Sequence, residues 1–129
     1  MVEILYRGKT FKDKWIEGLP WKKKYNDGNR VFISYFPDMD DNEEREPVKK
    51  ETLGRFSGIT DKHGIKVFVG DILKDSDGKL YLVVEEETRI VIKKQDKRVT
   101  TWKYTHKKQI VGNIHDNPDL WRWNNGKNI

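Results

Sequence analysis

Apolar and polar residues alternate over short stretches of this chain, and almost no segment has the spacing of an amphipathic helix. Val, Ile, Tyr, Phe and Trp concentrate in these stretches, which clusters of Gly, Asn and Asp separate. Such a pattern is typical of strands joined by tight turns. It predicts strands at residues 3–8, 14–18, 30–36, 65–74, 80–86, 88–94, 98–104 and 109–114.

The turn residues indicate how these strands connect. Residues 3–8 and 14–18 are close enough in sequence to pair as an opening hairpin. Asp77-Gly78 lies between two apolar runs and predicts a type I′ turn, which needs positive φ at both central residues. Gly64 is expected at another position of positive φ, and Gly70 interrupts a strand, as at a bulge or a barrel corner.

The predicted fold is mainly β. We expect a small, strongly bent sheet or SH3-like barrel over about residues 50–115, with an N-terminal β-hairpin lobe packed on or beside it. Residues 117–123, NPDLWRW, predict a short C-terminal helical turn. Asn117 would cap this turn, and Pro118 would stand at its first position.

An acidic segment, PDMDDNEEREP at residues 37–47, follows the predicted N-terminal strands. Its six acids and one arginine give −5; since the whole chain carries +5, the remaining residues sum to +10. Pro37 and Pro47 oppose strand continuation, so we expect an exposed, mobile loop. The predicted domains are residues 1–36 and 48–129 on either side of this loop, or one single domain of residues 1–129.

Composition excludes several classes of function. The 129 residues include no cysteine, which excludes disulfides, thiolate zinc sites and a cysteine nucleophile. The longest apolar run, residues 80–84, is far too short to cross a membrane, and the N-terminus has no signal-peptide pattern. We therefore expect a cytoplasmic protein with no membrane partner.

Three blocks occur in order along the chain: EILYRGKTFKDKWIEG, TLGRFSGITDKHGIKVFVGDIL and IVGNIHDNPDL. Together they resemble the YopX-like family of phage and prophage proteins over roughly the whole chain. Arg55, Ser57 and Val69 depart from the family's usual residues, but the turn residues match. The matching positions with an expected structural role are Gly54, Gly58, Asp61, Gly64, Gly70, Asp71, Gly112, Asn113, Asn117 and Pro118.

The resemblance implies a β-rich fold, a phage or prophage origin and a location in the host cytoplasm. It brings no catalytic residues, because the family is generally described as being of unknown function.

The polar residues of the central block admit two interpretations. Arg55, Asp61, His63 and Asp71 could converge on a catalytic site. Alternatively, the two aspartates bond nearby backbone amides in turns and His63 is solvated, which turn chemistry alone explains. We favour the second interpretation. The three histidines have no metal-ligand spacing, and we expect neither a metal nor a cofactor.

Two other motifs fail on their context. Asp38 with Asp77-Gly78-Lys79 formally matches a PD…(D/E)xK nuclease signature, but that chemistry needs two carboxylates on neighbouring strands. Residues 38–49 begin like an EF-hand loop, but Glu43 stands where Gly is needed and Lys49 where the final Glu is needed. We therefore expect no enzymatic activity.

Basic residues are interleaved with aromatic ones in three clusters, at residues 21–25, 102–108 and 121–123. Aromatic faces stack on bases while lysines neutralise phosphates, which is how single-stranded nucleic acid is held without sequence readout. Equally, lysine stems could cover a core that the rings supply. The candidate nucleic-acid-binding residues are Trp21, Lys22, Lys23, Lys24, Tyr25, Trp102, Lys103, Tyr104, Lys107 and Lys108.

The favoured expectation is a non-enzymatic phage or prophage accessory protein that acts through contacts with a protein partner or with itself, as a homo-oligomer. It rests on a well-specified β scaffold without a catalytic constellation in the sequence. Single-stranded nucleic-acid binding through the basic and aromatic clusters is the alternative.

Overall fold

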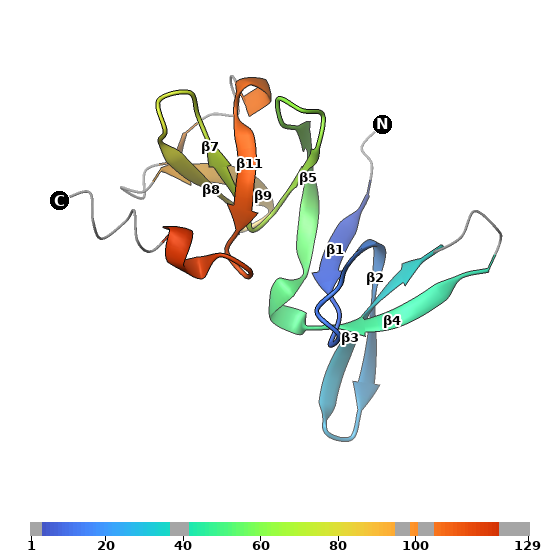
Figure 1. Ribbon diagram of the computed structural model, residues 1–129. Coiled ribbons are helices and arrows are strands. Elements are labelled where there is room, and N and C mark those ends of the chain that lie inside the picture. Colours follow the sequence, from blue (N-terminus) through green and yellow to red (C-terminus); the bar gives the residue numbers. More distant parts are fainter. Residues whose placement is uncertain (1–3, 37–41, 95–98, 101–104, 122–129) are drawn as a thin grey trace. The chain divides into compact units, whose positions relative to one another are not determined.

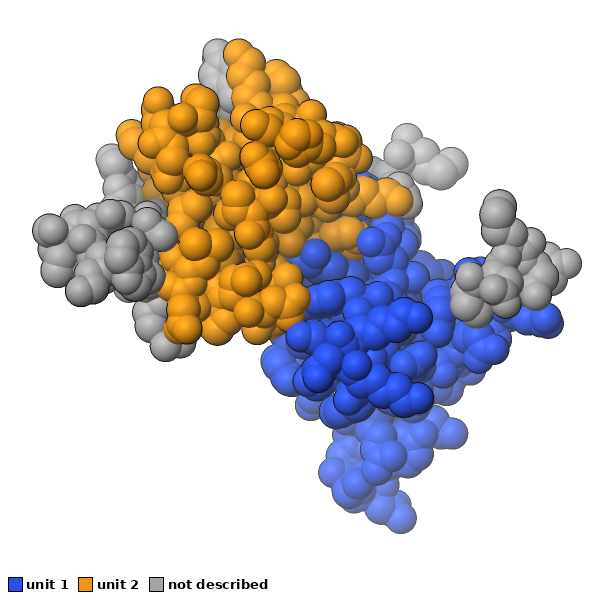
Figure 2. All heavy atoms as spheres, in the orientation of Figure 1, with its two compact units in different colours: residues 1–56 blue, residues 57–129 orange. Residues whose placement is uncertain are grey.

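The computed structural model describes residues 4–36, 42–94, 99–100 and 105–121. The chain divides into two compact units, Met1–Phe56 and Ser57–Ile129, here called unit 1 and unit 2. Figure 1 shows the elements of each unit, and Figure 2 gives each unit its own colour. This division differs from the predicted one at residue 48, because Val48 belongs to the core of unit 1.

Unit 1 is an antiparallel sheet with the strand order β4-β3-β2-β1-β5. Its strands are β1 (Tyr6–Lys9), β2 (Trp15–Tyr25), β3 (Gly28–Tyr35), β4 (Glu44–Val48) and the first residues of β5 (Gly54–Thr60). A 3-10 turn, η1 (Lys50–Thr52), joins β4 to β5. Tyr6 lies opposite Gly18, so the predicted opening hairpin is confirmed.

Strand β2 is longer than predicted because it pairs with two neighbours in succession. Residues 15–18 pair with β1, and residues 19–25 pair with β3, so the far half of the β2–β3 hairpin extends beyond β1 (Figure 1). The sequence prediction ended this strand at residue 18. The strand continues through Pro20, which has no N–H to donate. Pro20 lies beyond Gly18, the last residue paired with β1, so the β1–β2 pairing loses no hydrogen bond.

The prediction of an acidic loop at residues 37–47 is wrong for its second part. Residues 44–47 belong to β4, which runs in register with β3 from Tyr35↔Glu44 to Val31↔Val48. Pro47 is tolerated because β4 is an edge strand, with hydrogen bonds required on only one side. Residues 37–41 lie outside the described residues.

One face of the unit 1 sheet forms its core. Ile16, Val31, Ile33 and Val48 are buried together there, and Ile33 is fully buried. Gly18 lies on this face, and a Cβ at Gly18 would come within 2.0 Å of a backbone oxygen of β3. Burial of apolar surface on one side of the sheet leaves the other side for solvent or a partner.

Unit 2 contains a five-stranded antiparallel sheet with the order β10-β9-β8-β7-β11. Its strands are β7 (Asp71–Lys74), β8 (Leu80–Glu86), β9 (Arg89–Lys94), β10 (Val99–Thr100) and β11 (Gln109–Asn113), while β6 (Lys66–Phe68) pairs with β5 and η2 (Thr105–Lys107) precedes β11. The chain is therefore mainly β, as predicted. Among the described strands no closed barrel is found, so the SH3-like detail stays a prediction.

The core of unit 2 is built by Val67, Leu73, Tyr81, Val83 and Ile92. Gly70 separates β6 from β7 and has φ of +101°, which confirms the predicted interruption. Its N–H donates to the carbonyl of Val83, and its carbonyl accepts from the N–H of Ile114, both at 2.8 Å. Backbone hydrogen bonds thus join the Gly70 corner to β8 and to the residue that follows β11.

Three turns share one bonding pattern, although they lie in different units. Each closes five residues, with the first N–H donating to the last carbonyl and the fourth N–H donating to the first carbonyl; the turns are 10–14, 61–65 and 75–79. The side-chain oxygen of the first residue, Thr10, Asp61 or Asp75, accepts two more N–H groups of its turn. The fourth residue has positive φ: +63° at Asp13, +78° at Gly64 and +84° at Gly78.

The type I′ turn predicted at Asp77-Gly78 is therefore wrong, whereas the predicted positive φ at Gly64 is confirmed. Gly78 has positive φ, but Asp77 does not, so the connection is a three-residue hairpin loop rather than a two-residue one. The Asp75 carboxylate favours this alternative, because it binds the N–H groups of Asp77 and Lys79.

The predicted C-terminal helical turn begins at Pro118, directly after Asn117. Asn117 thus stands at the predicted cap position, and its Oδ1 accepts the N–H of Asn113 at 3.1 Å. Gly112 makes this possible, because a Cβ there would lie 2.5 Å from Asn117 Oδ1. The Asn113 side chain accepts from His115 and Asp116, so the motif fixes the end of β11.

Candidate binding surface

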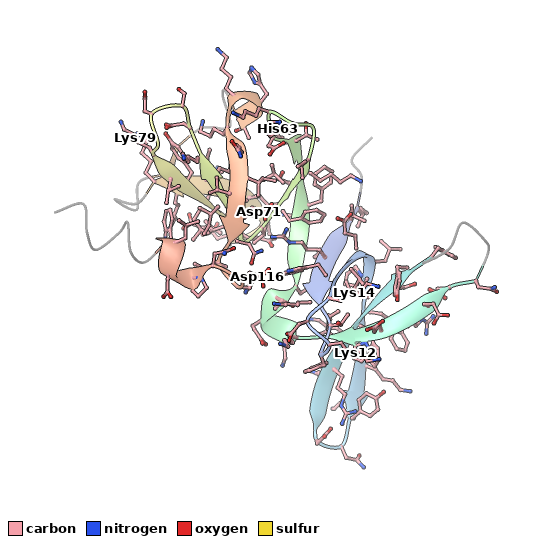
Figure 3. The ribbon with its side chains drawn as sticks, in the orientation of Figure 1. Lys12, Lys14, His63, Asp71, Lys79 and Asp116 are labelled. Carbon is pink, nitrogen blue, oxygen red and sulfur yellow. The ribbon has the colours of Figure 1, made fainter. Side chains whose placement is uncertain are left out.

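The carboxylates of the central block are buried hydrogen-bond acceptors. Asp71 Oδ2 accepts the N–H of Phe68 at 2.8 Å and closes the corner between β6 and β7. Asp61 accepts from His63 and Ile65 in its turn and from Ile110 on β11. Figure 3 places the exposed His63 apart from Asp71. Both aspartates thus bind backbone amides, as the second interpretation of the central block expects.

The ionisation of Asp61 follows from its partners. Burial alone would raise the pKa of this carboxyl, but the N–H groups of Ile110, Ile65 and His63 outweigh burial and lower it. Asp61 is thus a carboxylate at neutral pH, and it ties the turn after β5 to β11.

The glycines that match the family pattern have positions that suit their type. Gly58, Gly64 and Gly70 all have positive φ, and Gly54 is buried where β5 pairs with β1. These residues shape the scaffold.

The described residues include no group of three or more His, Asp or Glu side chains that could hold a metal ion. Asp77 and Lys79 of the nuclease-like signature lie in the 75–79 turn, and Asp38 lies outside the described residues. No helix in the described ranges is long and apolar enough to cross a membrane.

The second basic cluster, at residues 102–108, is described only in part. Trp102, Lys103 and Tyr104 lie outside the described residues, and Lys107 is exposed. Lys108 is only 8% exposed, and its Nζ lies 4.8 Å from the centre of the Tyr81 ring. This packing disfavours the role in nucleic-acid binding that was predicted for Lys108, because its amino group lies over the Tyr81 ring.

The surroundings of Lys108 form a buried polar cluster. The Tyr81 hydroxyl donates to Asp75 Oδ2 at 2.7 Å. Burial, together with this bond, raises the pKa of Tyr81 to about 12. Burial also lowers the pKa of Lys108, although the nearby Asp75 partly opposes this. The cluster ties the 75–79 turn to β8.

Strand alternation divides the first basic cluster, residues 21–25, between two faces. Lys22 lies opposite Val31 and so belongs to the core side of the sheet, as does Lys24, two residues along. Trp21, Lys23 and Tyr25 lie on the outer side. Of the residues proposed from the sequence, only these three come together in the described structure.

Three residues that the sequence did not single out complete this outer surface. Trp21 lies opposite Phe32, Lys23 lies opposite Arg30, and Arg45 on β4 lies opposite Ser34, on the same face as Phe32. We call this surface the aromatic face; it consists of Trp21, Lys23, Tyr25, Arg30, Phe32 and Arg45. The register of the β2–β3 hairpin would have identified Arg30 and Phe32, but Arg45 lay in the segment expected to be a loop.

The rings and cations of the aromatic face contact one another. The Arg45 guanidinium lies 4.2 Å from the centre of the Trp21 ring, and the Trp21 and Phe32 rings meet edge to face at 5.5 Å. Arg30 lies 4.4 Å from the centre of the Tyr25 ring, and Lys23 Nζ lies 5.4 Å from it. Trp21 nevertheless remains 36% exposed. The contacts order the surface without burying it.

Acidic side chains moderate the charge of this face. Arg30 forms an ion pair with Asp27 at 2.9 Å, and Arg45 lies 3.7 Å from Glu43. Glu43 also accepts a hydrogen bond from Ser34. The positive charge is therefore partly neutralised, and the face combines apolar rings with paired charges.

A comparison with protein families settles the classification. A family model described as "YopX protein" matches residues 5–122. The chain belongs to the YopX family. This confirms the resemblance found in the three sequence blocks. No curated protein matches the chain significantly.

A solved structure supports the fold of this YopX-family chain. The crystal structure of protein EF1440 from Enterococcus faecalis is similar to it with a TM-score of 0.58 and 20% sequence identity. The similarity covers 94% of this chain and 99% of that chain. At this identity the likeness shows the fold alone.

Proposed function

We propose that this YopX-family protein is a non-enzymatic binding module that holds a protein partner on the aromatic face of unit 1. The observation that carries the proposal is the composition of that face. Trp, Tyr and Arg dominate the energetics of protein interfaces, and here they share one exposed surface opposite the core. A phage or prophage accessory protein of the cytoplasm is the setting we infer.

The rigidity of the surface supports this proposal. Side chains on paired strands lose less conformational freedom on binding than side chains on loops. The edge-to-face contact of Trp21 with Phe32 and the stacking of Arg45 on Trp21 already restrict all three side chains. A partner would therefore meet an ordered surface.

Self-association through the edge strand β4 is disfavoured by charge. Two copies of β4 related by a two-fold axis would pair antiparallel with residues of the same face opposite each other. If the two-fold axis passes beside Arg45, the two Arg45 side chains face each other. If it passes beside Glu46, the two Glu46 side chains face each other, so both registers bring like charges together. We therefore propose that any self-association through unit 1 uses the aromatic face.

The experiment that tests the proposal is site-specific photo-crosslinking in cells. A benzoylphenylalanine at Leu19, which is 53% exposed and on the same face as Trp21, reports on that surface; one at Lys79 in unit 2 is the control. We expect a protease-sensitive adduct at position 19 alone. Trp21→Ala or Arg45→Ala should abolish it, because each truncates an expected anchor.

Lys22→Ala is the matched variant for this experiment, since Lys22 is exposed on the same strand but on the other side of the sheet. It should leave the adduct intact. An adduct of twice the 15.4 kDa chain mass would identify self-association. Equal adducts at positions 19 and 79, or equal loss with all three variants, would contradict the proposal.

Single-stranded nucleic acid is the second candidate, because three cations stand beside the rings of the aromatic face. It is less well supported, since guanidinium groups already lie over Trp21 and Tyr25 where bases would stack. Tryptophan-fluorescence titration with single-stranded DNA, duplex DNA and RNA tests it. Quenching that weakens steeply between about 50 and 200 mM salt, and is lost in Trp21→Ala, would favour it over a protein partner.

The fold of unit 2 carries a finer proposal. We infer that its sheet bends into an SH3-like barrel, and the positive φ at the Gly70 corner supports this. Backbone NMR of the whole chain tests the inference through amide contacts between the two edge strands, β10 and β11. Their absence would leave an open sheet.

A further inference from the structure

Unit 1 has a hollow between the 10–14 turn, the start of β3 and the end of β4. Its volume is about 460 Å³, which is within the usual range of ligand pockets. Its apolar lining comes from Phe11, Val31, Pro47 and Val48. Phe11 is 67% exposed. The hollow is therefore an apolar surface of unit 1 that no described residue fully covers.

The rim of the hollow is mainly basic. Arg30, Lys49 and Lys50 line it, against the single acid Glu51. Lys12 and Lys14 are exposed on the turn that carries Phe11 (Figure 3). The surroundings of this apolar hollow thus favour a negatively charged occupant.

Some of these cations already have partners, and others do not. Asp13 lies 2.8 Å from Lys49 Nζ, and Asp27 pairs with Arg30. Lys12, Lys14 and Lys50 form no ion pair with any residue that the structure describes. These three lysines are available to an acidic ligand at no cost of a broken ion pair.

The hollow and the aromatic face share one residue, Arg30, although Val31 and Val48 of the hollow belong to the core side of the sheet. Pro47, which lines the hollow, pairs with Phe32 of the aromatic face. A partner segment that binds in the hollow could therefore also contact the aromatic face at Arg30. When one segment makes two contacts, binding of the first raises the effective concentration of the second, so the overall affinity exceeds that of either contact alone.

We propose that the hollow takes an apolar side chain from an acidic segment of the partner protein, with flanking carboxylates on Lys50, Lys12 and Lys14. The inference rests on the proposed protein-binding function. Charge complementarity selects an acidic segment, and the apolar lining requires an anchor such as phenylalanine.

The test uses the full chain labelled with ¹⁵N and the blocked peptide Asp-Glu-Phe-Glu-Asp as the probe. Two matched peptides accompany it: Asp-Glu-Ala-Glu-Asp lacks the anchor, and Lys-Arg-Phe-Arg-Lys reverses the charge. We expect amide shifts confined to residues 10–14, 29–31 and 47–51 with the first peptide. The other two should bind at least about tenfold more weakly, because one loses the buried ring and the other is repelled.

Two variants locate the site. Phe11→Ala removes part of the apolar lining, and Lys50→Glu reverses an exposed rim charge; each should weaken the acidic peptide about fivefold or more. Lys79→Glu makes the same charge change on an exposed turn residue of unit 2 and should have no effect. Amide spectra of each variant confirm its fold before binding is compared.

The outcomes separate this inference from the function on which it rests. Equal binding of the acidic and basic peptides, or shifts outside the three stretches, would overturn the acidic-segment proposal. The crosslink at position 19 would still stand in that case. If the crosslink at position 19 is absent but the acidic peptide still binds, the proposed role of the aromatic face is contradicted and that of the hollow stands.

Discussion

The two units place their polar chemistry in opposite positions. Unit 2 keeps charged groups inside: Asp61, Asp71 and Lys108 are all buried. Among the described residues of unit 1, the buried polar ones are Thr10 and Thr52, whereas the rings and cations of the aromatic face lie on the outer side of the sheet. Buried charges therefore contribute to the fold of unit 2, whereas unit 1 carries Lys23, Arg30 and Arg45 on the outer side of its sheet.

This difference separates family membership from function. Most residues that carry the resemblance to the YopX family lie in unit 2, where they bind backbone amides or take positive φ. The surface that we propose for binding lies in unit 1, on a hairpin that the sequence blocks only partly include. A motif strong enough to identify a family need not mark its working surface.

The largest expected effect tests the core of unit 1. Ile33→Ala should cost about 3 kcal/mol, because Ile33 is fully buried between strands and a cavity would remain. Urea unfolding monitored by amide hydrogen exchange checks this. Protection should fall in residues of unit 1 and persist in the strands of unit 2. Equal loss of protection in both would show that the units unfold together.

The second prediction compares equivalent turn residues across the units. Asp61→Ala should cost about 2–3 kcal/mol, because it leaves three backbone N–H groups without their acceptor. Thr10→Ala, at the same position of the 10–14 turn, removes bonds to two N–H groups within that turn and should cost about 1 kcal/mol. Urea midpoints of the two variants measure the difference. Equal costs would mean that the bond to Ile110 adds nothing.

The sequence predicted the strands well because their signal is local. Alternating apolar residues and turn glycines indicated the opening hairpin, the corner at Gly70 and the positive φ at Gly64. It failed at β4, where two prolines and many acids suggested a loop, because an edge strand needs hydrogen bonds on only one side. That tolerance depends on the strand order, which local pattern does not contain.

The candidate site was harder to predict, for a related reason. A run such as WKKKY looks like one cluster in sequence, but a strand sends alternate side chains to opposite faces. Arg45 joins the aromatic face through the pairing of β4 with β3, a contact that requires the tertiary register. The burial of Lys108 was not predicted, because nothing in its sequence neighbours indicates that it packs against Tyr81.

The third prediction concerns two tyrosines at alkaline pH. The pKa of Tyr81 in unit 2 is raised from 10.0 to about 12 by burial and by Asp75. The unfolded chain therefore loses this proton first, so the stabilisation is complete below pH 10 and is lost as the pH rises through about 12. The ionisation of Tyr81 alone should lower the free energy of unfolding by about 1 kcal/mol between pH 9 and pH 11.

Tyr81→Phe should flatten that alkaline decline, at the cost of the bond to Asp75. Tyr35 in unit 1 is the comparison. Its pKa is also raised, by burial and then by Glu46, to which its hydroxyl donates. Tyr35→Phe should change the pH dependence less, since Tyr35 is only half-buried. If Tyr35→Phe changes the pH dependence of the unfolding free energy more than Tyr81→Phe does, the more strongly buried tyrosine would be the one in unit 1, not the one in unit 2.

The smallest expected effects compare two strained residues, one in each unit. Glu87 joins β8 to β9 with φ of +58°, and its exposed side chain has no partner among the described residues. Glu87→Gly should therefore stabilise unit 2 by about 0.5–1 kcal/mol, by relieving strain that glycine does not have. A thermal unfolding scan measures the shift.

Asp13 has φ of +63° in unit 1, but glycine should bring little gain there. Aspartate tolerates this conformation better than glutamate, and Asp13 also holds Lys49 at 2.8 Å. Relief of strain and loss of the ion pair should nearly cancel in Asp13→Gly. If Asp13→Gly stabilises as much as Glu87→Gly, the ion pair contributes nothing, and Lys49 would count among the cations available at the hollow.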